Sequence, residues 1–266
     1  MPRILIVEGD TPDLLDRAAR HGLPGNAGIY ARSLLAIDPN LKISVVEPYA
    51  AGFDLQAFLP DAFDGIVFTG SNVPWSVAAP DARPLRVTME TAFRSGTPVL
   101  GSCNGMQMAA LLLGGEVAES PNGMELGIAR GITLTEEGRS HPLHSGRRPV
   151  FACPCVHRDE VRRLPDGAVL TAWNKHTPVQ AMVYETGGVT YWGMQYHPEA
   201  TLREFADLIS LPGCIFAEGG DLVDDLRVAD SAPQGDAARR LGASEDDLEP
   251  AMRSRELANW LSMLAT

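Results

Sequence analysis

The first 115 residues alternate between short apolar runs and segments with helical spacing. Four nearly uninterrupted apolar runs are typical of strands that are buried on both faces of a parallel sheet. The segments between them repeat apolar residues at helical spacing, which predicts a doubly wound α/β sheet with right-handed crossovers. The expected strands are residues 3–8, 42–47, 64–70 and 98–103, and the expected helices are residues 13–20, 26–38, 83–94 and 108–114.

The pattern changes after residue 115, where short β-rich runs are separated by turns. These runs predict antiparallel or mixed strands at the edge of the sheet. A further helix is expected at residues 201–209. The expected strands are residues 126–134, 149–156, 168–173, 179–184 and 190–195.

The chain becomes acidic and helical after Gly213. Three helical pieces are expected, at residues 221–228, 236–241 and 250–264. The last piece carries an apolar stripe that includes Leu257 and Trp260, which favours packing on the sheet; a lid or a partner surface is the alternative. We therefore divide the chain into a domain of residues 1–212 and an acidic helical extension of residues 213–266 packed on it.

The 266-residue chain is 45% hydrophobic and 21% charged, and its formal net charge is −12. This negative charge argues against nucleic acids and anionic membrane surfaces as partners. Residues 1–8 have neither the length nor the flanks of a signal peptide, and no later apolar stretch is long enough to span a bilayer. The four cysteines are too few and too unevenly spaced for a disulfide framework. We expect a cytoplasmic enzyme with reduced thiols.

A Gly-x-Cys-x-Gly turn joins the fourth expected strand to the helix after it, with Cys103 between Gly101 and Gly105. It is the thiol counterpart of the Gly-x-Ser-x-Gly elbow, in which the nucleophile sits on a strained turn at a strand end. The dipole and the free N–H groups of the following helix favour thiolate over thiol. The pattern predicts that Cys103 is a nucleophile.

A nucleophilic thiol needs a base, and one of the six histidines is placed to act as one. His197 ends an apolar strand and has a carboxylate, Glu199, two residues further on. Side chains two apart on an extended chain face the same way, so Glu199 can orient the imidazole. The sequence therefore predicts a triad of Cys103, His197 and Glu199.

A metal site is the alternative for a second group of residues. Cys153, Cys155 and His157 alternate along one expected strand, so all three side chains can face one side. The sequence offers no second cluster of ligands, and three ligands within five extended residues seldom converge on one ion. We therefore expect no metal ion, and the sequence indicates no cofactor.

The Gly-x-Cys-x-Gly turn together with the His197–Glu199 pair resembles the motifs of the class I glutamine amidotransferases. This triad-type family hydrolyses the side-chain amide of glutamine. The similar segments look most like the glutaminase domain of GMP synthetase and its free-standing relatives. The resemblance implies a flavodoxin-like fold from the first strand to the helix after Glu199. The segments that carry it are residues 101–107, 114–117, 157–161, 164–168, 178–181 and 193–199.

The resemblance implies that Cys103 attacks a γ-glutamyl amide, with His197 as base and then acid and Glu199 as its orienter. The oxyanion needs two preorganised N–H donors. The amide of Asn104, just after the nucleophile, is one of them. Gly70, in the loop after the third strand, is the second, because neighbouring parallel strands bring their C-terminal loops together.

Three further residues are candidate substrate contacts. Gln107 matches the substrate-binding glutamine of the family, and Val156 and His157 match a strand that grips the glutamyl group. Val156 stands where relatives often have serine. Valine is tolerated there if the position binds the glutamyl group through main-chain groups, whereas binding weakens if a hydroxyl is needed. The expected substrate is a small molecule, glutamine or a γ-glutamyl amide.

Three functions remain open for such a chain. It is a free-standing hydrolase of glutamine or a γ-glutamyl conjugate, a glutaminase subunit that hands ammonia to a separate synthase, or a non-catalytic regulatory or binding domain. The sequence has no nucleotide-binding loop and no room for a synthase domain. The extension at residues 213–266 is similar to that of free-standing members, and we favour the hydrolase.

Overall fold

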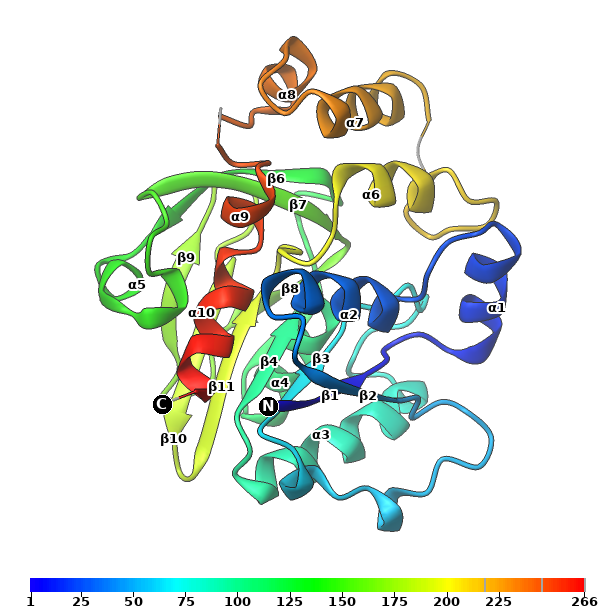
Figure 1. Ribbon diagram of the computed structural model, residues 1–266, viewed down its shortest axis with the longest axis vertical. Helices are drawn as coiled ribbons and strands as arrows, with labels where there is room; N and C mark the ends of the chain where they lie inside the picture. The colour runs from blue at the N-terminus through cyan, green and yellow to red at the C-terminus, as the bar shows by residue number, and fades with distance from the viewer. Residues whose placement is uncertain (218, 245, 266) are drawn as a thin grey trace.

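A mixed nine-stranded sheet forms the centre of the computed structural model, which describes residues 1–217, 219–244 and 246–265 (Figure 1). Within these residues the strand order is β2-β1-β3-β4-β11-β10-β9-β6-β7. Strands β5 (Glu116–Glu119) and β8 (Asp159–Arg163) form a separate antiparallel pair, which the sequence pattern did not predict. The α/β class and the mostly parallel core of the sheet are confirmed.

The first half of the sheet is parallel, and its strands are largely buried except for the partly exposed edge strand β2. Each strand in it pairs in parallel with its neighbour, and the side chains of Ile4, Ile6 and Val67 are fully buried. Uninterrupted apolar runs form these strands because helices cover both faces of the sheet. The strands are β1 (Arg3–Val7), β2 (Lys42–Val46), β3 (Gly65–Phe68), β4 (Val99–Ser102) and β11 (Val189–Met194).

The second half of the sheet is antiparallel. The sequence predicted these strands at the edge of the sheet. In the structure, four of them extend the same sheet beyond β11. They are β10 (Ala181–Thr186), β9 (Val169–Trp173), β6 (Glu125–Leu134) and β7 (Val150–His157). A tight turn at residues 187–188 joins β10 to β11, which an antiparallel pair allows and a parallel pair does not. A longer segment that contains the helix Glu136–Ser140 joins β6 to β7.

Helices cover both faces of the parallel half. On one face α2 (Asn26–Ile37) and α10 (Arg255–Leu264) pack against β1 and β11, and on the other lie α3 (Arg83–Ser95) and α4 (Asn104–Leu112). Helix α4 begins four residues earlier than expected, directly at the nucleophile candidate. The remaining helices are α1 (Pro12–Arg20), α5 (Glu136–Ser140), α6 (Leu202–Ile209), α7 (Asp221–Ser231), α8 (Asp236–Leu241) and α9 (Pro250–Arg253). Short 3₁₀ turns cover Leu55–Ala57, Pro60–Ala62, Pro80–Ala82 and Pro142–His144.

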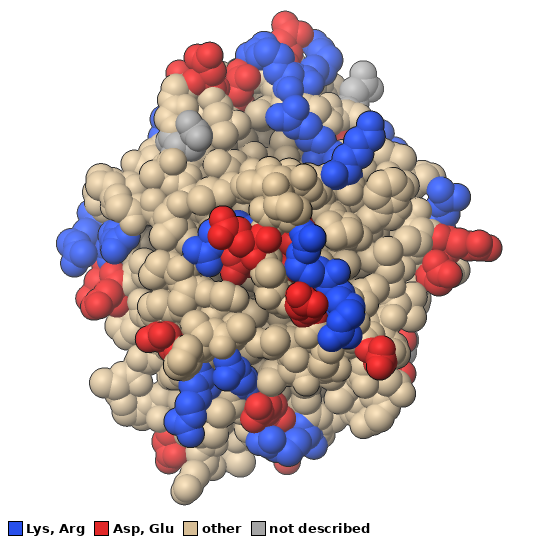
Figure 2. All heavy atoms as spheres, turned by 180° about the vertical axis from the view of Figure 1, so that it is seen from behind, with Lys and Arg blue, Asp and Glu red and all other residues tan. Residues whose placement is uncertain are grey.

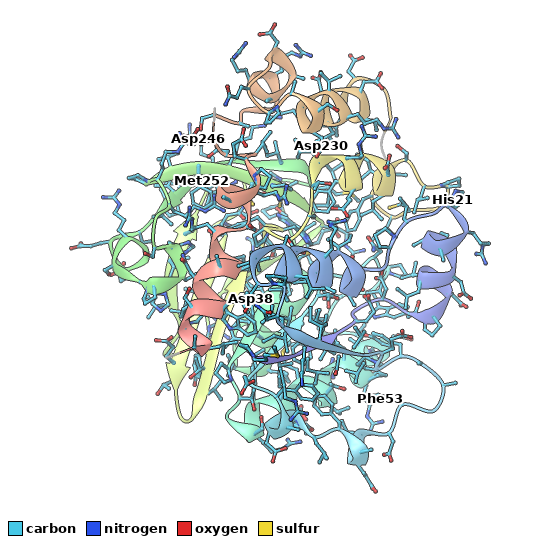
Figure 3. The ribbon with its side chains drawn as sticks, in the orientation of Figure 1. His21, Asp38, Phe53, Asp230, Asp246 and Met252 are labelled. Atoms are coloured by element: carbon cyan, nitrogen blue, oxygen red, sulfur yellow. The ribbon has the colours of Figure 1, made fainter. Side chains whose placement is uncertain are left out.

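The C-terminal helices pack on the rest of the chain at two places. Helices α7 and α8 share an apolar cluster with α6 and the β6–β7 hairpin, whereas α10 returns to the centre of the sheet (Figure 1). Figure 3 shows Asp230 on the side of α7 that faces α6, where it accepts from the Arg203 N–H, and Met252 where the chain turns back towards α10. Leu257 and Trp260 are fully buried. The apolar stripe therefore serves burial; the boundary at residue 212 stays a prediction.

A buried ion pair fastens α10 to the loop before β7. The Arg147 guanidinium donates to both oxygens of Glu256, at 2.8 and 2.7 Å, and Tyr196 donates to the same carboxylate at 3.0 Å. Burial raises the pKa of Glu256, but Arg147 and His144 outweigh it and lower that pKa from 4.5 to about 2. Glu256 is thus charged and fully compensated at neutral pH.

Charged side chains on the face behind the view of Figure 1 are mixed in sign. Figure 2 shows acidic and basic groups side by side across this face, separated by uncharged surface.

In the described part of the chain, no helix combines the length and the apolar character that crossing a bilayer requires.

We expect Glu256→Gln to lower the free energy of unfolding by about 3–5 kcal/mol, because Arg147 is left charged and buried without its partner. Denaturant unfolding measures this loss. Since the folded pKa of Glu256 is about 2 and its ordinary value 4.5, the stability it contributes is present above pH 4.5. The difference from wild type should therefore shrink as the pH falls from 4.5 towards 2.

The matched control is Arg239→Ala, which removes an exposed ion pair with Asp236. It should leave the unfolding midpoint unchanged at all pH values. Equal losses in the two variants would contradict a specific role of the buried pair.

Candidate active site

Cys103 occupies a strained turn between β4 and α4. Its φ of 48° and ψ of −107° make it the one non-glycine residue with positive φ among the described residues. The turn is tight, because a β-carbon at Gly101 would collide with the Tyr191 hydroxyl and one at Gly105 with the Phe68 carbonyl. Glycine is therefore required at both positions of the motif, because neighbouring atoms leave no room for a side chain. This geometry is that of a nucleophile elbow.

The cysteine is buried at the first turn of α4. Its side chain is 5% exposed, its N–H donates to the Met194 carbonyl at 2.7 Å, and its thiol donates to the Val156 carbonyl at 3.6 Å. Its own carbonyl accepts from Gln107 N–H at 2.9 Å, which starts the helix. The thiol thus lies at the positive end of a helix dipole.

His197 and Glu199 lie beside this thiol, at the end of β11. His197 Nδ1 is 2.7 Å from Glu199 Oε1, and the hydroxyl of Ser102 donates to the same oxygen at 3.0 Å. The ring of Phe205 packs edge-on against the imidazole, with centroids 5.0 Å apart. In the described part of the chain, His197 Nε2 is buried without a geometric hydrogen-bond partner. Nδ1 of His197 is therefore held by Glu199, whereas Nε2 has no protein partner and can bind a reacting group.

The surroundings of His197 favour its charged form. Burial lowers the pKa of His197, but the Glu199 carboxylate and the adjacent Cys103 thiol outweigh burial and raise it to about 10. At neutral pH the imidazole is therefore protonated. An imidazolium beside the thiol favours the thiolate by direct attraction.

Gly70 lies against both Cys103 and His197, after β3. A β-carbon on Gly70 would be 2.7 Å from His197 Cε1 and 3.6 Å from Cys103 Cβ. The turn that follows is anchored by the buried carboxylate of Asp10, which accepts from Asn72 N–H at 2.5 Å and from the Ser71 hydroxyl at 3.0 Å. Burial raises the pKa of Asp10, so these donors hold an otherwise unfavourable carboxylate in place. The strand order therefore brings Gly70 against both Cys103 and His197, and its role as an oxyanion donor stays a prediction.

A small hollow, of about 290 Å³ including the open space at its mouth, lies beside the thiol. The side chain of Gln107 lines it but is already engaged, since Nε2 donates to the Asp159 carbonyl at 2.6 Å and to Gln195 Oε1 at 3.2 Å. Asn104 Oδ1 is buried and has no protein partner within the described residues. The lining residues are Ser71, Val73, Trp75, Cys103, Asn104, Gln107, His157, Arg158, Asp159, Ile215 and Phe216. All but one of the residues predicted from the sequence for substrate contact line this hollow; Val156 instead contributes its carbonyl.

His157 belongs to a network of buried polar side chains. It does not form a ligand set with Cys153 and Cys155, as the metal-site alternative required. Its Nε2 lies 3.0 Å from Glu125 Oε2, which also accepts from Gln180 at 2.7 Å. Glu125, Cys155 and His157 lie within 4.8 Å of one another. However, burial keeps the Cys155 thiol protonated by raising its pKa, and amide donors already occupy the carboxylate. The arrangement fits a network that orients His157.

Several residues that shape the site were not predicted. Ile215 and Phe216, from the first residues of the extension, cover the hollow, and Trp75 and Asp159 line it. Asp10 anchors the turn after Gly70. None of these positions has a local pattern that marks it, because each reaches the site through a contact between segments far apart in the chain.

Comparisons with known proteins identify the family. The sequence model described as "Glutamine amidotransferase class-I" matches residues 34–210, more than half of the chain. The chain belongs to the class I glutamine amidotransferase family, as the resemblance of its motifs implied. It is accordingly an enzyme of the amide-hydrolysing glutaminase type.

Two relatives differ in how much of the protein they share. A γ-glutamyl-L-1-hydroxyisopropylamide hydrolase from a Pseudomonas species is 35% identical over 98% of this chain and 92% of its own length. A GMP synthase from Nitrosomonas eutropha is 39% identical over 52% of this chain. The chain spans about a quarter of the length of that synthase, since the match covers 25% of it.

Solved structures share the fold over nearly the whole chain. A glutamine amidotransferase from Thermotoga maritima matches with a TM-score of 0.63 at 17% identity, covering 99% of this chain and 97% of that one. A glutamine amidotransferase from Methylobacillus flagellatus matches with a TM-score of 0.52 at 18% identity, covering 99% and 92%. At such identities the likeness concerns the fold alone.

Gly70→Ala should reduce kcat by about 10²-fold or more, because the new methyl group displaces the His197 ring or the Gly70 N–H. Steady-state hydrolysis of glutamine measures the change. The control is Gly28→Ala, on the exposed surface of α2, which should keep wild-type activity. Wild-type activity in Gly70→Ala would contradict this placement of Gly70.

Glu199→Gln should lower kcat by at least about 10²-fold and move the alkaline limb of the kcat/KM profile to lower pH. The reason is that Glu199 raises the pKa of His197 to about 10, so the imidazolium persists up to that pH in the wild type. A pH profile of kcat/KM measures the shift, and the exposed Glu116→Gln serves as control. An unmoved alkaline limb would mean that Glu199 does not set the charge of His197.

Proposed function

We propose that this chain hydrolyses the γ-glutamyl amide bond of glutamine or a γ-glutamyl conjugate through a triad of Cys103, His197 and Glu199. The observation that carries the proposal is the meeting of three features at one point. A strained cysteine, a histidine held by a carboxylate at 2.7 Å and a hollow beside the thiol come from separate segments of the chain. Such a constellation is what nucleophilic acyl transfer requires.

The first half of the reaction forms a thioester. The Cys103 thiolate attacks the amide carbon, and the N–H groups of Asn104 and Gly70 stabilise the oxyanion. The His197 imidazolium then gives its proton to the leaving nitrogen, and the carbon–nitrogen bond breaks. Ammonia or an amine is released, and a γ-glutamyl thioester with neutral His197 remains.

The second half of the reaction consumes water. His197, now neutral, takes a proton from a water molecule that attacks the thioester carbon. The carbon–sulfur bond breaks, glutamate is released, and the thiolate–imidazolium pair is restored. Glu199 stays ionised throughout and keeps Nε2 of His197 directed at the thiol. No cofactor takes part in this sequence of steps.

The glutamyl group is proposed to occupy the hollow beside Cys103. Gln107 and His157 line it, and the Val156 carbonyl borders the thiol at 3.6 Å. Both side chains are fixed by protein hydrogen bonds, so they present rigid edges. A rigid site limits the entropy lost on binding.

The free-standing hydrolase is favoured over a synthase subunit. The relative from Pseudomonas, whose name gives a γ-glutamyl amide of an amino alcohol as substrate, covers 98% of this chain, including the C-terminal helices. The GMP synthase from Nitrosomonas eutropha covers 52% of this chain. Ile215 and Phe216, which cover the hollow, lie beyond the family match that ends at residue 210. Delivery of ammonia to a separate synthase is the second candidate, supported by the GMP synthase relatives.

A non-catalytic binding domain is the third candidate. It has no need of a strained backbone at Cys103 or of a buried, oriented imidazole, both of which cost stability. Their presence together favours catalysis.

Cys103→Ala and Cys103→Ser should each abolish hydrolysis of glutamine and γ-glutamyl amides, because the thioester cannot form. Glutamate release from the purified chain alone, with no partner protein, measures turnover. Circular dichroism of the variants should match wild type.

The control variant is Ser231→Ala, which changes an exposed residue at the end of α7 outside the hollow beside the thiol and should keep the wild-type rate. An active Cys103→Ala protein would exclude the mechanism. Turnover that begins only when a synthase is added would favour the ammonia-donating subunit.

A further inference from the structure

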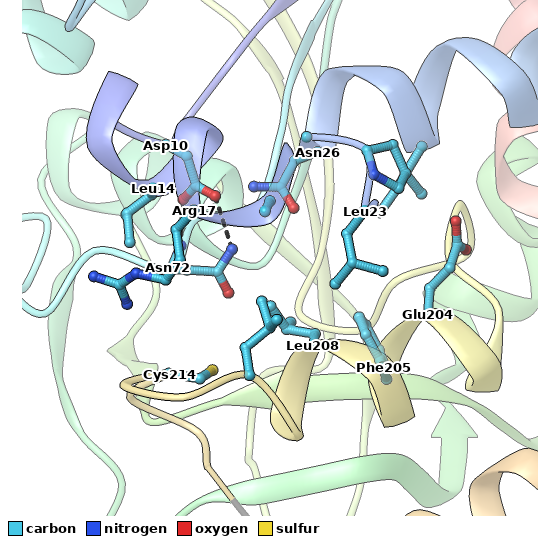
Figure 4. A pocket seen from close by; sticks show the side chains of 15 residues that line it. Asp10, Leu14, Arg17, Leu23, Asn26, Asn72, Glu204, Phe205, Leu208 and Cys214 are labelled. Atoms are coloured by element: carbon cyan, nitrogen blue, oxygen red, sulfur yellow. Dashed lines mark hydrogen bonds between the residues drawn. The ribbon is translucent and has the colours of Figure 1, made fainter. Parts of the chain in front are cut away.

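A glutamyl group carries an α-ammonium and an α-carboxylate besides its γ-carbonyl, and the proposed steps assign no side chain to either charge. A larger hollow between α1, the start of α2 and α6 lies apart from the thiol (Figure 4). It shares no lining residue with the hollow beside Cys103, and Phe205, in its wall, packs against the imidazole of His197. The two charges must therefore be recognised inside the smaller hollow.

Asn104 brings an unused hydrogen-bond acceptor to this smaller hollow. The residue lines the hollow, is 8% exposed and is the first residue of α4, directly after Cys103. Its Oδ1 is buried and accepts no hydrogen bond from the described residues. A buried amide oxygen without a donor is unfavourable and uncommon in folded proteins. Asn104 is therefore placed for a ligand that donates to it.

Gln107 adds a second amide on the same side of α4. Residues three apart share one face of a helix, and both Asn104 and Gln107 line the hollow. Nε2 of Gln107 donates to the Asp159 carbonyl at 2.6 Å and to Gln195 Oε1 at 3.2 Å, so both of its hydrogens are in use. A ligand can therefore meet only the oxygen of this amide. The face of α4 that lines the hollow thus offers acceptors and suits a group with several N–H donors.

The charged side chains of the lining favour the same orientation of the substrate. Asp159 is the one carboxylate among the lining residues, and Arg158 holds its two oxygens at 2.7 and 3.2 Å. A third N–H of Arg158 donates to the Pro74 carbonyl at 3.0 Å, so two of the five N–H groups of the guanidinium have no partner within the described residues. An α-carboxylate is expected at this guanidinium, which leaves the acceptors of α4 to the α-ammonium.

We propose that Asn104 is a specificity-determining residue whose Oδ1 accepts from the α-ammonium of the glutamyl group, and that the preferred substrates carry a free α-amino group. The inference rests on the proposed hydrolysis. In a γ-glutamyl amide the α-nitrogen is four bonds from the attacked carbon, roughly 5 Å when extended. Because Asn104 directly follows the nucleophile, its side chain lies within that reach when Cys103 meets the γ-carbonyl.

The test removes the acceptor without changing its shape. Leucine has the branching of asparagine but no polar atom, so Asn104→Leu removes only the proposed hydrogen bond. The ligands are L-glutamine and glutaramate, which is glutamine without its α-ammonium. In the Cys103→Ala background, Asn104→Leu should raise the Kd of L-glutamine by at least about tenfold and should not weaken the binding of glutaramate. Isothermal titration calorimetry measures both values.

Turnover gives the second readout. In the enzyme with Cys103 present, Asn104→Leu should lower the ratio of kcat/KM for glutamine to kcat/KM for glutaramate by at least about tenfold. The matched control is Asn40→Leu, the same change at an exposed residue before β2, which should leave both Kd values and the ratio at the parent values. If circular dichroism shows that Asn104→Leu does not fold, Asn104→Ala replaces it in both measurements.

The outcomes separate the contact from the hydrolysis. An unchanged Kd of L-glutamine in a folded Asn104→Leu protein would overturn the contact, as would an equal weakening of both ligands. Weakening confined to L-glutamine would support it. A wild-type enzyme that binds L-glutamine but releases no glutamate would overturn the hydrolysis, whereas the two Kd values would still decide the contact.

Discussion

The backbone of Cys103 is the constraint on which the rest of the site depends. A φ of 48° in a residue with a side chain is unfavourable by about 1–3 kcal/mol. It persists because β4 is paired on both sides, with β3 and β11, and because Gly101 and Gly105 let Tyr191 and Phe68 approach closely. The strain directs the thiol away from the sheet and towards His197. A relaxed turn would remove the geometry on which every proposed step relies.

The order of the strands decides which groups surround that thiol. Strands β3, β4 and β11 are neighbours and parallel, so the residues after them meet at one edge of the sheet. Gly70, Cys103 and His197 follow these three strands in turn. The C-terminal helix supports the arrangement from behind, because Glu256 accepts from the hydroxyl of Tyr196, the residue just before His197, at 3.0 Å. The extension therefore contributes to the site as well as to the core.

The sequence predicted correctly those features that depend on neighbouring residues in the chain. Uninterrupted apolar runs identified the buried parallel strands, and the glycine-flanked cysteine and the His-x-Glu pair identified residues that the structure brings together. It missed what depends on distant contacts. Strands β5 and β8 pair across forty residues of sequence, and neither is apolar enough to be recognised alone. Asp10 and Phe216 are similar cases: a lone acid after a strand and a lone aromatic residue in a turn gain meaning only when the fold brings them beside Gly70 and Cys103.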